Sequence, residues 1–252
     1  MSFFITFFNE LFFRPLLNAL VFFTSILPFH DLGLAVIILT VLVRFVLFPF
    51  THHSLKAQTK MRSLEPEIAR LRDKHKNNQE EQARRTMALY KEHGVNPFSG
   101  CVTILIQLPL LIALYRVFLV GVGDMDRYVY PFVSVPDSLH TQFLGLINLT
   151  EASIFLAALS GLTQFIQMKL AIPASSLRTA QKADISHIMT TQMKYVMPGV
   201  VFVIGLQFPA AVSLYWTTMN IFAIIHEMIV RKKAEVIQTT YEHDPERELK
   251  KL

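Results

Sequence analysis

The sequence predicts an all-α polytopic membrane protein, and three observations lead to this fold class. The composition is 52% hydrophobic with 21 Phe, and the mean hydropathy is +0.39, whereas a soluble domain of this length is markedly more polar. Five apolar runs approach or pass the roughly 20 residues that a helix needs to cross a bilayer. Lys and Arg gather in three hydrophilic regions between and after these runs.

The apolar runs are the predicted spans, at residues 33–50, 101–120, 152–172, 196–209 and 210–230. The fourth run holds only 14 residues, which corresponds to roughly 21 Å of helix against a hydrocarbon core of roughly 30 Å. It meets the fifth run at Phe208-Pro209 without a polar loop. We expect so short a hairpin to end below the outer surface or to thin the bilayer around it.

The distribution of basic residues predicts the orientation. Segment 51–97 carries ten Lys and Arg, segment 169–194 carries four and the tail after residue 230 carries six. With five spans, these regions share one side, and the opposite side receives only three: Arg14, Arg116 and Arg127. The positive-inside rule makes the basic side the cytoplasm. The C-terminus is therefore expected inside, and span 33–50 is expected to run from outside to inside.

Residues 3–28 allow two interpretations. Glu10, Arg14 and Asn18 lie four apart and Ser25 follows seven later, so one polar stripe runs down an aromatic-rich helix. This pattern favours a helix that lies in the outer membrane interface. The alternative is a sixth span.

Segment 51–97 predicts two short amphipathic helices that form an antiparallel hairpin, because apolar residues recur at spacings of three and four. Pro66 either kinks the first helix or lies in the first turn of a helix capped at Ser63. Asn78, with Glu three residues later, resembles a capping box for the second helix. Gly94 is a plausible helix stop. The wide basic face either serves only topology, as a solvated linker, or docks acidic partners or headgroups.

Polar side chains within the spans indicate a wet interior face. Gln107 lies in the second run and Gln164 in the third, and the last run carries Tyr215, Trp216 and Asn220. Amides and hydroxyls within hydrocarbon usually face protein or water. Each one alone could serve interhelical hydrogen bonding, but together they favour a hydrated interior.

Arg44 is the most costly of these groups, because a central Arg costs about 2.5–3.5 kcal/mol on insertion scales. It lies six residues before Phe50, with Thr40 one turn away on the same helix face. The side chain could snorkel to the inner headgroups. Alternatively it faces a water-filled cavity, which the absence of Asp or Glu from the middle of any span favours.

The motifs that the chain lacks weigh against enzymatic function. No G-x-x-x-x-G-K-[ST] phosphate loop and no G-x-S-x-G elbow occur, and His226-Glu227 begins an H-E-x-x-H pattern that fails at Val230. One Cys, Cys101, excludes a multi-cysteine metal site. We therefore expect no enzyme, no cofactor and no metal. An anion channel or transporter stays open as the alternative, because an intramembrane Arg suits anions.

Four ordered stretches resemble the YidC-type membrane protein insertases, a family with mitochondrial and chloroplast relatives. They lie between about residues 7 and 231: ILTVLVRFVLFPF, LYKEHGVNPFSGCVTILIQLPLLIALYRV, LSGLTQFIQMK and MPGVVFVIGLQFPAAVSLYWTTMN. The resemblance implies five core helices around a hydrophilic groove that opens to the cytoplasm and to lipid. It also implies a cytoplasmic helical hairpin and an outer interfacial helix.

The resemblance also implies a site and a function. Arg44 and Thr40 would face the groove, Gln164 and Trp216 would line it, and Tyr215 would lie near the substrate path. Gln107 is added to this set for its polarity. The implied activity is ATP-independent insertion and folding of nascent membrane proteins in the bacterial inner membrane. Possible partners are the ribosome, a targeting receptor and the Sec translocon, through segment 51–97 and the tail 231–252. No direct DNA binding is expected.

The expected organisation follows from these assignments, in five parts: the N-terminal interfacial helix 1–30, the first core span 31–50, the basic hairpin 51–97, four further core spans in 98–230 and the cytoplasmic tail 231–252.

Overall fold

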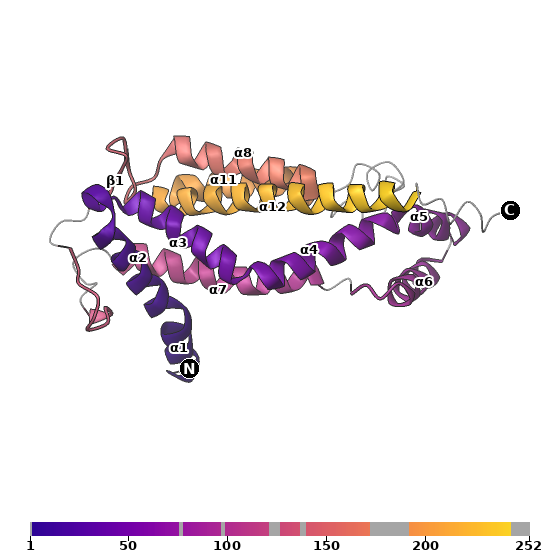
Figure 1. The fold of residues 1–252 in the computed structure, drawn as a ribbon, viewed down its shortest axis with the longest axis horizontal. Helices are drawn as coiled ribbons and strands as arrows, with labels where there is room; N and C mark the ends of the chain where they lie inside the picture. Colours follow the sequence, from indigo (N-terminus) through magenta and orange to yellow (C-terminus); the bar gives the residue numbers. More distant parts are fainter. Residues whose placement is uncertain are drawn as a thin grey trace.

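The computed structural model describes residues 2–75, 78–96, 99–120, 127–136, 140–171 and 192–242. The chain is an elongated bundle of helices (Figure 1). A small β-hairpin and the start of α3 lie at one end, and α5, α6 and the C-terminal end of α12 lie at the other (Figure 1). The all-α class predicted from composition is confirmed.

The N-terminal segment is helical throughout. It comprises α1 (Ser2–Phe8), a π-helical turn η1 (Asn9–Phe13) and α2 (Arg14–Ile26), and it runs obliquely to the long axis of the bundle (Figure 1). Its predicted polar stripe has partners within the protein. Arg14 pairs with Glu10 at 2.9 Å, and buried Asn18 donates to the Tyr128 carbonyl at 3.1 Å and accepts from the Tyr130 amide at 2.6 Å. Interfacial placement of this helix stays a prediction.

The first predicted span is a bent pair of helices. After a 3₁₀ turn η2 (Pro28–His30), α3 (Leu32–Val46) and α4 (Phe48–Ser63) meet at 66°. The bend has a covalent cause, since Pro49 has no N–H to donate to the carbonyl four residues back. The helix therefore breaks at Leu47, inside the predicted span 33–50, and its second arm runs on to Ser63. The inner boundary of this span at Phe50 stays a prediction.

Two further helices follow α4 in the basic segment: α5 (Glu65–Lys74) and α6 (Gln79–Glu92). Asn78 caps α6 by accepting from the Glu81 amide at 3.0 Å, and Gly94 adopts the left-handed φ of 63° that ends it, so the cap and the stop are confirmed. The reciprocal bond of a capping box does not form, because the Asn78 amide donates to the His75 carbonyl. Of the two alternatives for Pro66, its place in the first turn of a new helix is confirmed. The cap at Ser63 that went with this alternative is wrong, because α5 begins after Leu64 with no side-chain cap. Leu64, together with Ile68 and Val95, forms a small separate apolar cluster.

The rest of the bundle consists of α7 (Ser99–Val120), α8 (Ile154–Ala171), a π-helical turn η4 (Gln192–Val196), α11 (Met197–Gln207) and α12 (Ala210–Glu242). Helix α8 packs closely against both α11 and α12. Small residues allow this approach. A Cβ added to Gly205 would lie 2.9 Å from the Cβ of Ala157 and 2.7 Å from Oγ of Ser213.

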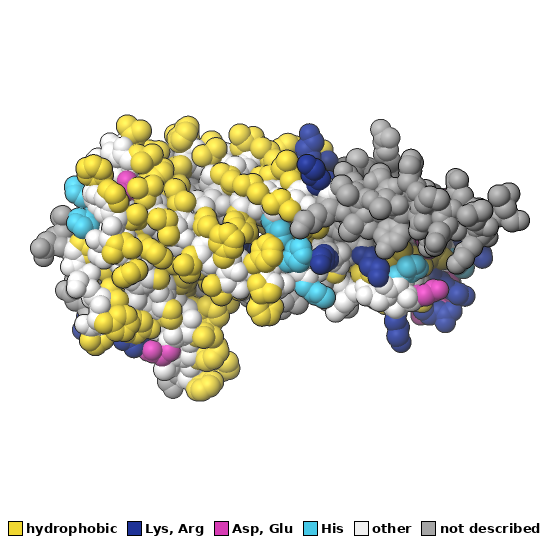
Figure 2. All heavy atoms as spheres, viewed as in Figure 1, with side chains coloured by type: hydrophobic (Ala, Val, Ile, Leu, Met, Phe, Trp, Pro, Cys, Tyr) yellow, Lys and Arg dark blue, Asp and Glu magenta, His cyan; other side chains and the backbone are white. Residues whose placement is uncertain are grey.

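Two of the described helices, Phe3–Ile26 and Ile154–Ala171, are long and apolar enough to cross a membrane. If the bent α3–α4 pair is counted as one span, the number rises to three. Gln107–Phe118 is a shorter apolar helix. The count of five spans stays a prediction. Hydrophobic side chains dominate the visible surface of most of the bundle, and most of the visible Lys, Arg and His lie toward the end that carries α5 and α6 (Figure 2).

Segment 140–151 lies at the end opposite α5 and α6, and it contains β1 (Gln142–Phe143) and β2 (Ile147–Asn148), which pair antiparallel (Figure 1). This segment holds the first turns of two helices. Asp31 caps α3 by accepting from Gly33 at 2.7 Å and also accepts from the Leu144 amide at 2.8 Å. The Ala210 amide at the start of α12 donates to the Glu151 carbonyl at 2.7 Å.

Candidate functional site

Arg44 lies in the last turn of α3, just before the bend, and its side chain is partly buried. Within the parts of the chain that the structure describes, the guanidinium makes no hydrogen bond and no ion pair. It lies within electrostatic range of two side chains of α12, Tyr215 and His226. The site therefore holds one charge that the described residues leave uncompensated.

Two pairs of polar side chains join α12 to its neighbours, and all four residues belong to the predicted site. Gln107 of α7 donates to the hydroxyl of Tyr215, and the indole N–H of Trp216 donates to Oε1 of Gln164 on α8 at 3.1 Å. Tyr215 and Gln164 are each 7% exposed. Consecutive residues of α12 thus connect it to helices on two sides. Four of the six expected site residues are brought together in this way, although the sequence did not show that they pair with each other.

Thr40, one turn before Arg44, is buried, and its hydroxyl donates to the Val36 carbonyl at 2.6 Å. Its hydrogen is therefore used within its own helix. A further polar contact lies between α8 and α12, where buried Asn220 donates to Oγ1 of Thr163 at 3.3 Å. Two buried hydroxyls of α12, Ser213 and Thr217, have no hydrogen-bond partner in the described part of the chain.

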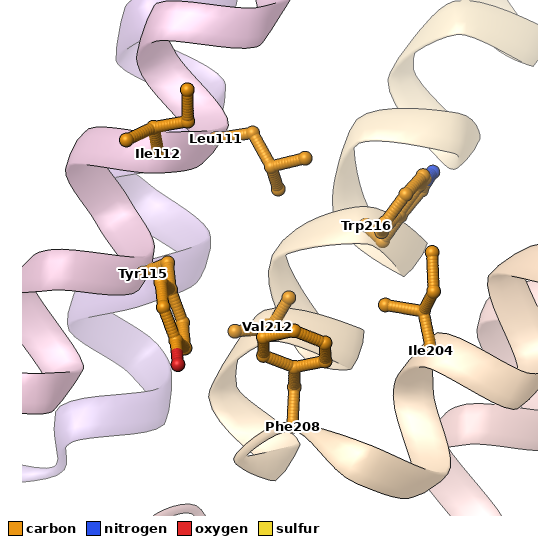
Figure 3. A pocket seen from close by; sticks show the side chains of 7 residues that line it. All are labelled: Leu111, Ile112, Tyr115, Ile204, Phe208, Val212 and Trp216. Atoms are coloured by element: carbon orange, nitrogen blue, oxygen red, sulfur yellow. The ribbon is translucent and has the colours of Figure 1, made fainter.

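An apolar pocket of about 250 Å³ lies beside this polar set, between α7 and the α11–α12 pair. Leu111, Ile112 and Tyr115 of α7 lie on one side and Phe208, Val212 and Trp216 on the other, with Ile204 beyond (Figure 3). Ile112 is 51% exposed. Trp216 belongs to both regions, since its ring lines the apolar pocket while its N–H reaches Gln164. The polar contacts of α12 and the apolar pocket therefore adjoin at one side chain.

A histidine pair near Arg44 could not be found by reading the sequence. His52 of α4 lies against His226 of α12, with Nδ1 of His52 and Nε2 of His226 3.1 Å apart. Both rings stack with Phe48, at centroid distances of 5.3 and 4.6 Å. The only sequence signals were His52-His53 beside an apolar run and the failed zinc pattern at His226. Neither signal pairs residues 174 positions apart.

The geometry of the site suits the attraction of an anionic group. One guanidinium can attract a carboxylate, and the surrounding amide, phenol and indole groups can solvate a polar chain. The adjoining apolar pocket can receive an aliphatic or aromatic side chain. A single site can thus contact both the polar and the apolar part of an amphipathic segment.

Comparison with known proteins gives the family. The model of the family described as "60Kd inner membrane protein" matches residues 22–246. A "Membrane protein insertase YidC" of Fusobacterium nucleatum is 31% identical over 204 residues, which cover 81% of this chain and 87% of that protein. "Membrane protein insertase MisCA" of Bacillus subtilis is 28% identical over 219 residues, which cover 85% of this chain and 76% of that protein.

Other relatives are longer than this chain. A "Membrane protein insertase YidC" of Pelobacter propionicus is 32% identical over 222 residues, which cover 87% of this chain but 38% of that protein. The chain therefore spans about two fifths of such relatives and most of the Fusobacterium and Bacillus ones. The family match covers well over half of the chain and includes every expected site residue. The chain belongs to the 60Kd inner membrane protein family, the family of the YidC-type membrane protein insertases.

Proposed function

We propose that the chain is an ATP-independent membrane protein insertase of the bacterial inner membrane, with its C-terminus in the cytoplasm. The observation that carries this proposal is the uncompensated charge of Arg44 beside the polar side chains of α12 and the apolar pocket. The proposed core consists of five helices around a hydrophilic groove, namely α3, α7, α8, α11 and α12. Relatives named membrane protein insertases support this assignment.

The first proposed step is electrostatic. A nascent membrane protein with a short acidic segment enters from the cytoplasmic side, and Arg44 attracts its carboxylate. A charge-assisted hydrogen bond of this kind contributes about 1.5–3 kcal/mol. That is comparable with the cost of about 2.5–3.5 kcal/mol for an acidic residue at the centre of a membrane helix. An ion pair with Arg44 would therefore offset much of the penalty that the acidic residue meets inside the membrane.

The second proposed step is partition into lipid. The apolar pocket between α7 and the α11–α12 pair lies next to Trp216, so the substrate's apolar side chains can leave the groove there. Burial of this surface in lipid contributes roughly 25 cal/mol per Å² and drives release. The π-helical turn η4 runs directly into α11, and together they have 16 residues. That is roughly 24 Å of helix against a hydrocarbon core of roughly 30 Å, so the polar segment would have a thinned layer to cross.

The ends of the molecule have separate proposed roles. The end with segment 140–151 faces outward, and the N-terminal helix 1–30 lies in the outer interface. The basic helices of segment 51–97 face the cytoplasm and receive the substrate, the ribosome, a targeting receptor or the Sec translocon, together with the tail 231–252. The described surface supports this orientation, because most of its visible Lys and Arg lie at the α5–α6 end (Figure 2).

Complementation tests the proposal. The chain is expressed in a bacterium depleted of its insertase, and insertion of a small single-span protein is followed by protease accessibility. Restored insertion is expected, and failure of a well-expressed wild-type chain to restore it would count against the insertase. Anion flux into reconstituted vesicles that disappears in Arg44→Ala would instead favour an anion channel.

A further inference from the structure

A second cavity lies where α4 leaves the apolar part of the molecule, away from the groove. It has a volume of about 600 Å³ and lies between α4 and the segment 94–96 that follows α6. Its lining has two parts. Phe50, Ala57 and Val95 give it an apolar floor, and the exposed side chains of Lys56 and Lys60 give it a cationic rim.

The cations of this rim have no partner within the described residues. The side-chain ammonium groups of Lys56 and Lys60 make no hydrogen bond or ion pair there, whereas the basic residues Arg84 and Arg85 of α6 are paired with Glu81 at 2.8 Å. No acidic side chain is among the described residues that line the cavity. Lys56 and Lys60 lie four apart on α4, so they project from the same helix face. Two like charges held together without a counter-ion favour an anion between them.

The position of the cavity along the molecule indicates which kind of anion it suits. Phe50 is 61% exposed, and the polar residues of α4 begin directly after it, so the apolar surface ends at this level. Figure 2 shows the same change, from hydrophobic side chains to Lys, Arg and His along the molecule. Headgroups of the inner leaflet lie where a membrane protein's apolar surface ends. A phospholipid headgroup presents a phosphate at this level and acyl chains on its apolar side.

We propose that this cavity binds an anionic phospholipid of the inner leaflet, with its phosphate between Lys56 and Lys60 and the start of its acyl chains against Phe50. Basic pockets on the cytoplasmic side of membrane proteins recognise such headgroups. Because α4 is joined to α3 through the bend at Leu47, a lipid held here fixes the direction of the α4 arm and of the helices that follow it. The proposal needs only the membrane orientation, and it is independent of insertase activity.

The test measures lipid retention by the purified full-length chain with native mass spectrometry, using phosphatidylglycerol and phosphatidylcholine with identical acyl chains. The variant Lys56→Gln/Lys60→Gln is compared with Arg70→Gln/Lys74→Gln, which removes the same charge at the same spacing from α5, outside the cavity. We expect retained phosphatidylglycerol to fall at least about fivefold in the α4 variant, since each basic residue near an anionic surface contributes about that factor. The α5 variant is expected to retain as much as the wild type.

A second variant tests the apolar part of the site without a change of charge. Ala57→Phe fills the floor of the cavity, and it is expected to lower phosphatidylglycerol retention while the circular dichroism spectrum stays that of the wild type. Equal falls in both charge variants, or equal retention of the two lipids, would overturn the proposal. Displacement of phosphatidylglycerol by inorganic phosphate alone would assign a simple anion site. Binding of an acidic peptide that is lost in the α4 variant, with lipid retention unchanged, would assign a peptide site.

Discussion

The hydrogen bond between Trp216 and Gln164 gives the most direct test of the described packing. An indole N–H can only donate, so its partner must be the carbonyl oxygen of the Gln164 amide, as the 3.1 Å contact shows. Trp216→Phe leaves that oxygen, in a side chain only 7% exposed, without its donor. Interhelical hydrogen bonds in membranes contribute about 0.6 kcal/mol on average and up to about 1.7 kcal/mol. We expect a coupling energy in this range.

A double-mutant cycle isolates this energy from the loss of ring area. The wild type, Trp216→Phe, Gln164→Met and the double variant are unfolded by titrating dodecyl sulfate into mixed micelles, with circular dichroism as the readout. The Gln164→Met single variant has a second signal, because Trp216 is the only Trp in the chain. Loss of the acceptor is expected to shift its emission to the blue. Additive free energies together with unchanged emission would refute the bond.

Three further predictions concern other contacts. Gly205→Ala is expected to lower the free energy of unfolding by about 1–3 kcal/mol, because the new Cβ would lie 2.9 Å from the Cβ of Ala157. A variant as stable as the wild type in the same unfolding assay would contradict this packing. Asp31→Ala removes the α3 cap and the hydrogen bond from the Leu144 amide, so the free energy of unfolding is expected to fall by about 1–3 kcal/mol. Amide hydrogen exchange in 140–151 should become faster in this variant, and an unchanged rate would contradict the prediction. Hydrogen bonds from Arg84 and, to a smaller extent, from Arg85 lower the pKa of Glu81 from 4.5 to about 2. The two ion pairs therefore contribute their full stabilisation of the fold above pH 4.5, and this stabilisation is lost as the pH falls through about 2. NMR titration should show this pKa rising toward 4.5 in Arg84→Ala, and a Glu81 that titrates near 4.5 in the wild type would contradict the pairing.

Local signals in the sequence predicted local structure well. The Asn78 cap and the left-handed Gly94 depend only on neighbouring residues, so a single stretch of sequence contains the information. The bend within the first predicted span was not predicted, because hydropathy does not show where a helix bends. The Phe48–Phe50 run is apolar, but Pro49 breaks the hydrogen-bond ladder within it.

The candidate site also has a part that the sequence predicts and a part that only the packing of the helices shows. Arg44 and the polar residues of α12 stand out from composition alone, since charged and amide groups are rare in apolar runs. The pairing of Trp216 with Gln164 needs the relative rotation of two helices, which no single helix encodes. The His52–His226 contact depends in addition on the α3–α4 bend, which turns α4 back toward the end of α12.

The measurement that tests the central claim most directly compares Arg44→Ala with Arg44→Lys in the insertion assay. Each is tested on two versions of one single-span substrate, which differ only in whether the translocated segment is acidic or neutral. The account predicts that Arg44→Ala inserts the acidic version at least about tenfold less well, since about 1.4 kcal/mol of lost attraction corresponds to that factor. It also predicts that Arg44→Lys keeps most of the activity and that the neutral version changes little. Equal insertion of the acidic substrate by Arg44→Ala and the wild type would contradict the proposed role of the groove arginine.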